Sequence, residues 1–526
     1  MRLRTFIGLA AATLLAPAAF GQLTAADVQR VINQAVTRAV KISPNSVIAV
    51  TDREGFVLAV WVVRGGAASQ AEIATAVSKA GTAGFLSSNQ NAFTSRTAGF
   101  IIQQHFPPGV RNTPPGPLVG VGLSNLFLSD INKFKKPGSR SLFNSSPGSA
   151  VTSVLFSSLD GSPGGVPLYK NGRLVGGVGV TGDGTPTPAI RGESPFPAVV
   201  RSENPFIFIA GYDKDEDVAL AGQSGYAPPA DIRATKVFIN GIRLPYTAST
   251  TSISPRSIRG NPDPQYPSIV ATQPIYPYPR LTLGGTPGEL RQPIISDPIS
   301  APIRGQRRLN SAEVTSIIDY AARRVRTTRA GIRLPIGTQM QVFITVVNNP
   351  NSPGTAPTVL GTFRTNDATL FSWDVSVQKA RTAVYYSDHD FLHFGRRIAM
   401  STRTVGFLAQ KNYPPGIDEE GPGPFYGHQE RLSGFRGRVP NPILNGKGLI
   451  GDLPNGITIF PGGFPLYRNG VLIGAIGISG DGVDQDDIVG ASGTHDFLAP
   501  FNIRADQFFF DDARLPYAKF PRDPER

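Results

Sequence analysis

The hydrophobic positions of the chain follow a helical period at two widely separated places. Apolar residues at positions i, i+3, i+4 and i+7 are typical of an amphipathic helix. Thr24 followed by Asp27 also has the spacing of an N-terminal capping box. The residues with this period are Val28, Val31, Ile32, Ala35, Val36 and Ala39 in the first set and Val314, Ile317, Ile318, Ala321 and Val325 in the second.

Apolar runs and turn residues then predict the same series of elements after each helix. Two strands joined by a turn are followed by a second helix, a long irregular segment and a second hairpin. The turn of that hairpin is an Asn-Gly pair, the strongest short signal for a two-residue hairpin. The pattern predicts an α+β fold, with one antiparallel sheet and helices packed on it. The predicted ranges are 46–51, 56–63, 71–84 and 174–180 in the first series and 341–347, 358–363, 373–386 and 472–478 in the second.

A direct comparison of the two halves shows that the chain is a duplication. Five short motifs recur in the same order, and the strongest is G-G-x-P-L-Y-x-N-G at 164–172 and again at 462–470. Between the copies, eleven prolines fall from Pro255 to Pro302. Proline restricts its own φ and biases the preceding residue to extended conformations. We therefore expect a first domain at 22–250, an extended linker without a core at 251–307, and a second domain at 308–526.

The N-terminus has the features of a secretory signal peptide. Arg2 and Arg4 precede an apolar run at 6–15, and Ala19-Phe20-Gly21 supplies small residues for cleavage before Gln22. The alternative, a retained membrane anchor, is disfavoured because a bilayer span needs about 20 apolar residues. We expect residues 1–21 to be removed, the mature protein to be secreted or periplasmic, and no membrane span to remain.

Composition limits the chemistry that the mature chain can perform. The sequence has no cysteine, which excludes thiol catalysis and thiolate metal sites. Without Arg2 and Arg4, 49 basic residues remain against 38 acidic ones, a net charge of +11. The basic residues are dispersed rather than clustered, so we expect no nucleic-acid partner. A mild attraction to anionic ligands or surfaces is the inference that the charge supports.

The motif set resembles the GlcG/HbpS-like haem-binding family, also called the haem-degrading domain. The resemblance rests on the opening L-T-x-x-D helix, the D-x-x-G hairpin, the K-A-x-T-A helix and the G-G-x-P-L-Y-x-N-G hairpin, and it covers most of both copies. It implies a profilin- or PAS-like α/β module that binds haem or a related tetrapyrrole and associates with like modules. We therefore expect haem as the cofactor and the two copies to pack on each other.

The candidate ligand residues lie in the second copy. His389 and His393 have the spacing that places two imidazoles on one helix face, and imidazole is a good axial ligand for haem iron. Arg396 and Arg397 follow and suit the propionate carboxylates. The alternative is a polar helix end or loop in which Asp388 and Asp390 hold the rings without a ligand role. The first copy has no histidine at 87–95, so this hypothesis gives binding to the second copy only.

Other motifs have a ligand interpretation and a structural one. Tyr169 and Tyr467 precede the Asn-Gly turns and are either phenolate ligands of iron or half-buried strand residues. The acidic cluster at 213–217 resembles a calcium loop but lacks its glycine and glutamate, so acids near a helix start explain it better. The G-x-G-x-x-G at 177–182 follows a hairpin strand and is not followed by a helix, which argues against a dinucleotide site.

Three functions are consistent with these observations. The leading hypothesis is an exported haem-binding or tetrapyrrole-binding protein that scavenges or senses its ligand. The second is a non-catalytic structural or interaction module that has lost haem binding. The third, an oxidative haem-degrading enzyme, follows only from the name of the family.

Overall fold

The computed structural model describes residues 22–103, 105–119, 121, 140–141, 152–154, 157, 159–184, 211–252, 258–272, 278–332, 337–390, 392–426 and 453–519. The expected signal peptide, 1–21, lies outside these residues. Among the described helices, none combines the length and the apolar character that a bilayer crossing requires.

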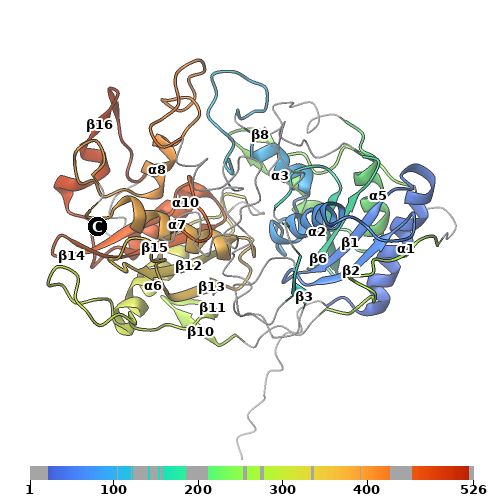
Figure 1. Cartoon of the computed structure of the whole chain (residues 1–526), viewed down its shortest axis with the longest axis horizontal. Coiled ribbons are helices and arrows are strands. Elements are labelled where there is room, and N and C mark those ends of the chain that lie inside the picture. Colours follow the sequence, from blue (N-terminus) through green and yellow to red (C-terminus); the bar gives the residue numbers. More distant parts are fainter. Residues whose placement is uncertain are drawn as a thin grey trace, which may run out of the picture.

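The first module is an antiparallel sheet in the order β5-β6-β1-β2-β9 with helices on both faces. It occupies one side of the molecule in Figure 1. Its longer elements are α1 (Ala25–Ile42), β1 (Val47–Asp52), β2 (Val57–Val62), α2 (Gln70–Phe85), α3 (Ser95–Ile101), β5 (Gly165–Lys170), β6 (Arg173–Thr181) and α5 (Lys214–Gln223). Its short strands are β3 (Arg140–Ser141), β4 (Thr152–Ser153), β7 (Phe238–Ile239), β8 (Ile242–Arg243) and β9 (Asn261–Pro262).

The second module repeats this arrangement in the sheet β10-β11-β13-β12-β15-β14. The predicted α+β fold with two like modules is confirmed. The elements of this module are β10 (Arg280–Leu283), β11 (Thr286–Gln292), α6 (Ser311–Val325), β12 (Val342–Asn348), β13 (Val359–Thr365), α7 (Ser372–Tyr386), α8 (Thr402–Leu408), β14 (Gly463–Arg468), β15 (Val471–Gly480), α10 (Val483–Gly493), β16 (Phe509–Phe510) and β17 (Ala513–Arg514).

Helices cover both faces of each sheet, which explains why the central strands are apolar throughout. In the first module, Val47 and Ala49 of β1 pack on the side of α2, whereas Ile48 and Val50 pack on the side of α1 and α5. Every residue of β1 is buried. A strand that is buried on both faces has a continuous apolar run rather than an alternating pattern.

The Asn-Gly hairpins form as predicted in both modules. Asn171 and Gly172 have φ angles of 54° and 72°, and Asn469 and Gly470 have 48° and 78°. Positive φ at both central residues matches the right-handed twist of the flanking strands. The turns join β5 to β6 and β14 to β15 in the same register.

The glycine run after the first hairpin serves helix packing. A Cβ atom at Gly177 would lie 2.2 Å from the carbonyl oxygen of Ala80 in α2, a distance that real Cβ atoms do not show. The contact that repeats in both modules is at Gly179 and Gly477, where a Cβ would lie 2.1 Å from the Ala76 oxygen and 2.0 Å from the Ser376 oxygen. Close approach of α2 and α7 to their sheets therefore requires glycine, in agreement with the rejection of a dinucleotide site.

The proline-rich segment differs from the expected linker without a core. Its strand β9 pairs with β2 at the edge of the first sheet, and its strands β10 and β11 extend the second sheet beyond β13, with β10 at the edge. Val270 N–H donates to the Leu58 oxygen, and Ile295 N–H donates to the corresponding Leu360 oxygen. These strands were not predicted because the segment is rich in proline, although proline is tolerated in edge strands.

Candidate functional site

The predicted ligand pair does not lie on one helix face. Helix α7 ends at Tyr386, so His389 lies in the following turn and His393 pairs with Arg396 in a small hairpin. The helical interpretation of the H-x-x-x-H spacing is therefore wrong. Both rings are nevertheless buried, with 8% of His389 and 4% of His393 exposed.

His389 acts as a backbone acceptor. Its Nε2 accepts a 2.8 Å hydrogen bond from the N–H of Leu472 in β15. In the first module, Asn89 Oδ1 accepts a 3.0 Å bond from the N–H of the corresponding Leu174. Burial, together with Arg304 and Arg397, lowers the pKa of His389 and favours the neutral ring. The His389 imidazole nitrogen thus accepts the hydrogen bond that the side-chain amide oxygen of Asn89 accepts in the first module.

His393 is held by a carbonyl group and by aromatic rings. Its Nε2 lies 2.9 Å from the Tyr386 oxygen, a distance at which the ring N–H donates to the carbonyl. The ring centre of His393 lies 5.9 Å from that of Tyr386, on which it stacks, and 5.2 Å from that of Phe425. Iron ligation through Nε2 would require either histidine ring to leave its present backbone partner.

Arg396 and Arg397 are both exposed beside this pair. The Arg396 guanidinium lies 5.8 Å from the ring centre of Phe508. Among the ion pairs formed by described residues, neither arginine takes part. The structure brings His393 and the two arginines together on one hairpin and leaves the guanidinium groups available to an anion.

The two tyrosines are buried structural residues. Tyr169 hydroxyl donates to the Ser88 and Asn91 oxygens at 2.6 and 2.9 Å, and Tyr467 hydroxyl donates to the Ser387 oxygen at 3.5 Å. Burial raises the pKa of each hydroxyl above its ordinary value. A phenolate ligand would need the opposite shift, so the strand interpretation fits.

The acidic clusters hold buried cations in both modules, a pairing that the sequence analysis missed. Lys79 Nζ lies 3.1 Å from Asp215 Oδ2, and Lys379 Nζ lies 2.8 Å from Asp486 Oδ2. Each ammonium also donates to a strand carbonyl, of Val180 or Ile478. The signal in the sequence was the lysine of K-A-x-T-A, which recurs together with an acidic cluster in each copy.

A second pair of ion contacts repeats beside the first. Arg96 binds Glu216 in a bidentate manner at 2.7 and 2.9 Å. Arg403 contacts Asp487 at 2.5 Å and Asp484 at 2.7 Å. The acids lie at the starts of α5 and α10, where they also favour the helix dipole. No described residues form a group of histidine and acidic side chains suited to a metal ion.

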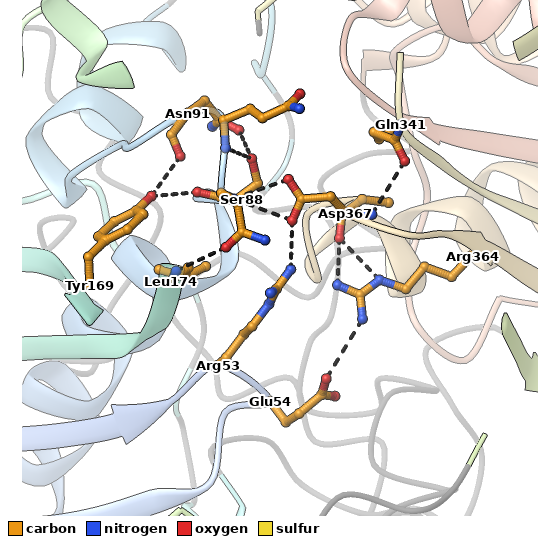
Figure 2. Close-up of polar contacts among 12 residues, drawn as sticks. Arg53, Glu54, Ser88, Asn91, Tyr169, Leu174, Gln341, Arg364 and Asp367 are labelled. Carbon is orange, nitrogen blue, oxygen red and sulfur yellow. Dashed lines mark hydrogen bonds and ion pairs between the residues drawn. The ribbon is translucent and has the colours of Figure 1, made fainter. Parts of the chain in front are cut away.

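Polar contacts also join the two modules (Figure 2). Asp367 of the second module accepts from the Arg53 guanidinium at 2.9 Å and from the backbone N–H of Asn89 at 3.1 Å, both in the first module. Trp373 of α7 belongs to the same apolar cluster as Phe85 of α2. Polar and apolar contacts therefore join the loop that follows α2 to the start of α7.

A buried charge cluster lies next to these contacts. Glu54 of the first module binds Arg291 at 2.8 Å, Arg291 binds Glu289 at 2.6 Å, and Arg364 lies 3.2 Å from Glu289. Arg291 also lies over the Tyr278 ring at 4.1 Å. Two arginines and two glutamates balance in charge, which buried ions require. Burial and the neighbouring Arg291 lower the pKa of Arg364 to about 10.

One apolar cavity lies beneath α3 in the first module. Its volume is about 10 Å³, and it is lined by Leu86, Ala98, Ile102, Leu118, Val121, Leu159, Asp160 and Gly161. Pockets for drug-sized ligands usually measure roughly 300–1,000 Å³. This cavity is therefore too small for a tetrapyrrole in its present shape.

Comparison with known proteins places these features in a family. A family model described as haem degrading protein HbpS-like matches residues 23–187 and 337–495, which together make up more than half of the chain. The match falls on both modules and confirms the resemblance inferred from the motifs. Among proteins of curated function, none is significantly similar to the chain.

Solved structures provide further likenesses. PduOC, crystallised in complex with haem, is 22% identical over 36% of this chain and 94% of its own, with a TM-score of 0.23. The ORFY protein of Klebsiella pneumoniae is 18% identical over 37% and 96%, also with a TM-score of 0.23. A double mutant of HbpS from Streptomyces reticuli is 16% identical over 38% and 95%, with the same TM-score.

Proposed function

Since the chain belongs to the family of HbpS-like haem-degrading proteins, we propose that it binds haem or a related tetrapyrrole. The observation that carries the proposal is the family match on both modules, over 23–187 and 337–495. The haem in the complex of the similar protein PduOC is in keeping with this ligand class.

We place the ligand at the hairpin that carries His393, Arg396 and Arg397. The two exposed guanidinium groups suit the carboxylates of a tetrapyrrole, because arginine forms charge-assisted hydrogen bonds with carboxylate. Iron ligation by His389 or His393 stays a prediction, because Nε2 of each ring now contacts a backbone group. The residues therefore fit the carboxylates and the apolar ring of the ligand better than its iron.

We further propose that the protein acts outside the cytoplasm, as a scavenger or a sensor of its ligand. The signal-peptide pattern predicted at 1–21 supports this proposal. Cleavage before Gln22 would be visible as the N-terminal residue of the protein isolated from its source.

Titration of the mature chain with haem, followed by visible spectroscopy, tests the proposed function. We expect a shifted Soret band that saturates, and a weaker affinity after a combined Arg396→Gln and Arg397→Gln substitution. Arg243→Gln is the matched control, because Arg243 is an exposed arginine of the first module. An unchanged Soret band in the unsubstituted protein would remove the proposal, and product analysis with a reductant would separate binding from degradation.

A structural or interaction role is the second candidate. It is favoured by the backbone partners of both histidines and by the buried charge cluster between the modules. In that case the chain would leave the haem spectrum unchanged, while a stable complex with another exported protein would copurify.

A further inference from the structure

The connection between the second and third helices is longer in the second module. Lys79 and Lys379 are 300 positions apart, whereas Ala92 and Ala399 are 307 apart. The alanines correspond, because Ala92 bridges Arg233 and Ala399 bridges Arg504 in the same parallel manner. Seven additional residues therefore lie between His389 and Ala399, and the described residues 393–396 form a hairpin there that has no counterpart between Asn89 and Ala92.

The tip of this hairpin has an unfavourable residue for its backbone. Phe394 has a φ of 53° and Gly395 a φ of 73°, the pattern of a tight two-residue turn. The hairpins at Asn171 and Asn469 place asparagine at the first position, which tolerates positive φ. A phenylalanine in this conformation is strained, and such strain is concentrated at functional sites.

The tip also exposes apolar surface over an aromatic base. Phe394 is 43% exposed and the neighbouring Leu392 is 59% exposed. The Phe394 ring lies 4.5 Å from the ring centre of Phe510 and stacks at 9° to Phe425 at 6.2 Å. The ring is thus fixed by its neighbours, and its remaining surface faces outward.

The charge of the tip is positive. Arg396 and Arg397 follow the turn and make no ion pair with a described residue, whereas the nearby Asp390 is engaged by Arg304 at 2.8 Å. An exposed aromatic surface flanked by two guanidinium groups is complementary to a planar apolar ring with carboxylates at its edge.

We propose that this hairpin is a platform on which a planar, anionic tetrapyrrole stacks against Phe394, with its carboxylates at Arg396 and Arg397 and without a histidine on its iron. The inference rests on the proposed function and specifies its site. Because the contacts involve the ring and the carboxylates, the central metal is not required for binding.

The test compares haem with metal-free protoporphyrin on the full mature chain. Quenching of porphyrin fluorescence and the Soret shift give the two affinities, which we expect to agree within about threefold. Phe394→Asn should weaken both by about tenfold, since an aromatic stack is lost. This substitution creates the Asn-Gly pair that the other hairpins use, so the turn itself should be retained, as a thermal melt would show. Phe238→Ala, at a 52% exposed phenylalanine of the first module, is the control and should change neither affinity.

The outcomes separate the site from the function. If neither compound binds, the proposed function fails and the platform with it. If haem binds but Phe394→Asn leaves its affinity unchanged, the function stands and the platform is overturned. Haem binding far tighter than porphyrin binding, lost in His393→Gln, would establish iron ligation instead. If Phe394→Asn abolishes binding of the chain to anionic phospholipid vesicles but leaves porphyrin binding unchanged, the hairpin contacts a membrane surface and the proposal is overturned.

Discussion

The two modules bury the same lysine in the same place but surround it differently. Lys79 faces three carboxylates, of Asp215, Asp160 and Asp213. In the second module, Thr458 replaces Asp160, and the ring centre of Phe460 lies 5.1 Å from Lys379 Nζ. Burial lowers the pKa of both lysines, but the three carboxylates raise that of Lys79 above its ordinary value. The pKa of Lys379 stays below its ordinary value, because Asp486 offsets its burial only in part.

The difference shows that one fold tolerates two ways of compensating a buried charge. The first module places an additional carboxylate, Asp160, near the lysine. Burial of this carboxylate is unfavourable and raises its pKa. The second module replaces the additional carboxylate with a hydroxyl and an aromatic ring. The modules therefore share a scaffold while their electrostatics diverge, which gives each module its own response to mutation and to pH.

Replacement of each buried lysine should have the largest effect and tests whether the two modules differ in how they compensate its charge. Lys79→Met leaves these three carboxylates without their cation and should lower the free energy of unfolding by about 3–5 kcal/mol. Lys379→Met leaves Asp486, which can take up a proton, and should cost about 2–3 kcal/mol. Urea denaturation of both variants measures the difference, and a larger loss in Lys379→Met would contradict the account.

The pH dependence of stability should follow Asp486. Burial raises its pKa from 3.8 to about 7, so the folded chain holds this proton more tightly than the unfolded chain. Its contribution to stability is complete below about pH 4 and is lost as the pH rises to 7, by on the order of 2–4 kcal/mol. Asp486→Asn should flatten this part of the stability profile. Asp496→Asn, at an exposed aspartate, is the control, and an equal effect of both variants would refute the assignment.

An exchange between the modules tests whether His389 acts as a hydrogen-bond acceptor. His389→Asn installs the residue of the first module and should change stability by less than about 1 kcal/mol. His389→Leu leaves the Leu472 N–H without its partner and should cost about 1–3 kcal/mol. Thermal melts of the two variants decide, and equal stability of both would show that the hydrogen bond is unimportant.

The smallest expected effect tests a feature that the modules share. Asn171→Ala and Asn469→Ala each place a Cβ-bearing residue in the left-handed region without the tolerance of asparagine. Each should lower the free energy of unfolding by about 1 kcal/mol. Unequal losses in urea melts would show that the two hairpins are not equivalent in energy.

Local patterns predicted much of the scaffold because the signals were local. Thr24 forms the expected capping box with Asp27, and both Asn-Gly pairs adopt positive φ. These elements depend on residues three positions apart or adjacent to each other. The identities of a few neighbouring residues were therefore enough to predict these elements.

The site was less predictable because it depends on distant contacts. The prediction ended this helix at 386, as α7 does, but the spacing of His389 and His393 gave no sign that the His393 ring packs back on Tyr386 and Phe425. The pairing of Lys79 with Asp215 joins residues far apart in the chain, and spacing alone does not show it. The same holds for β11, which the prolines of its segment concealed.

The stoichiometry of binding tests the central claim most directly, because the hairpin with Phe394 exists in the second module alone. Isothermal titration of the mature chain with metal-free protoporphyrin should give one equivalent per chain, and Phe394→Asn should weaken that single event. Two equivalents per chain with similar affinity would contradict the account, since the first module would then bind without the hairpin.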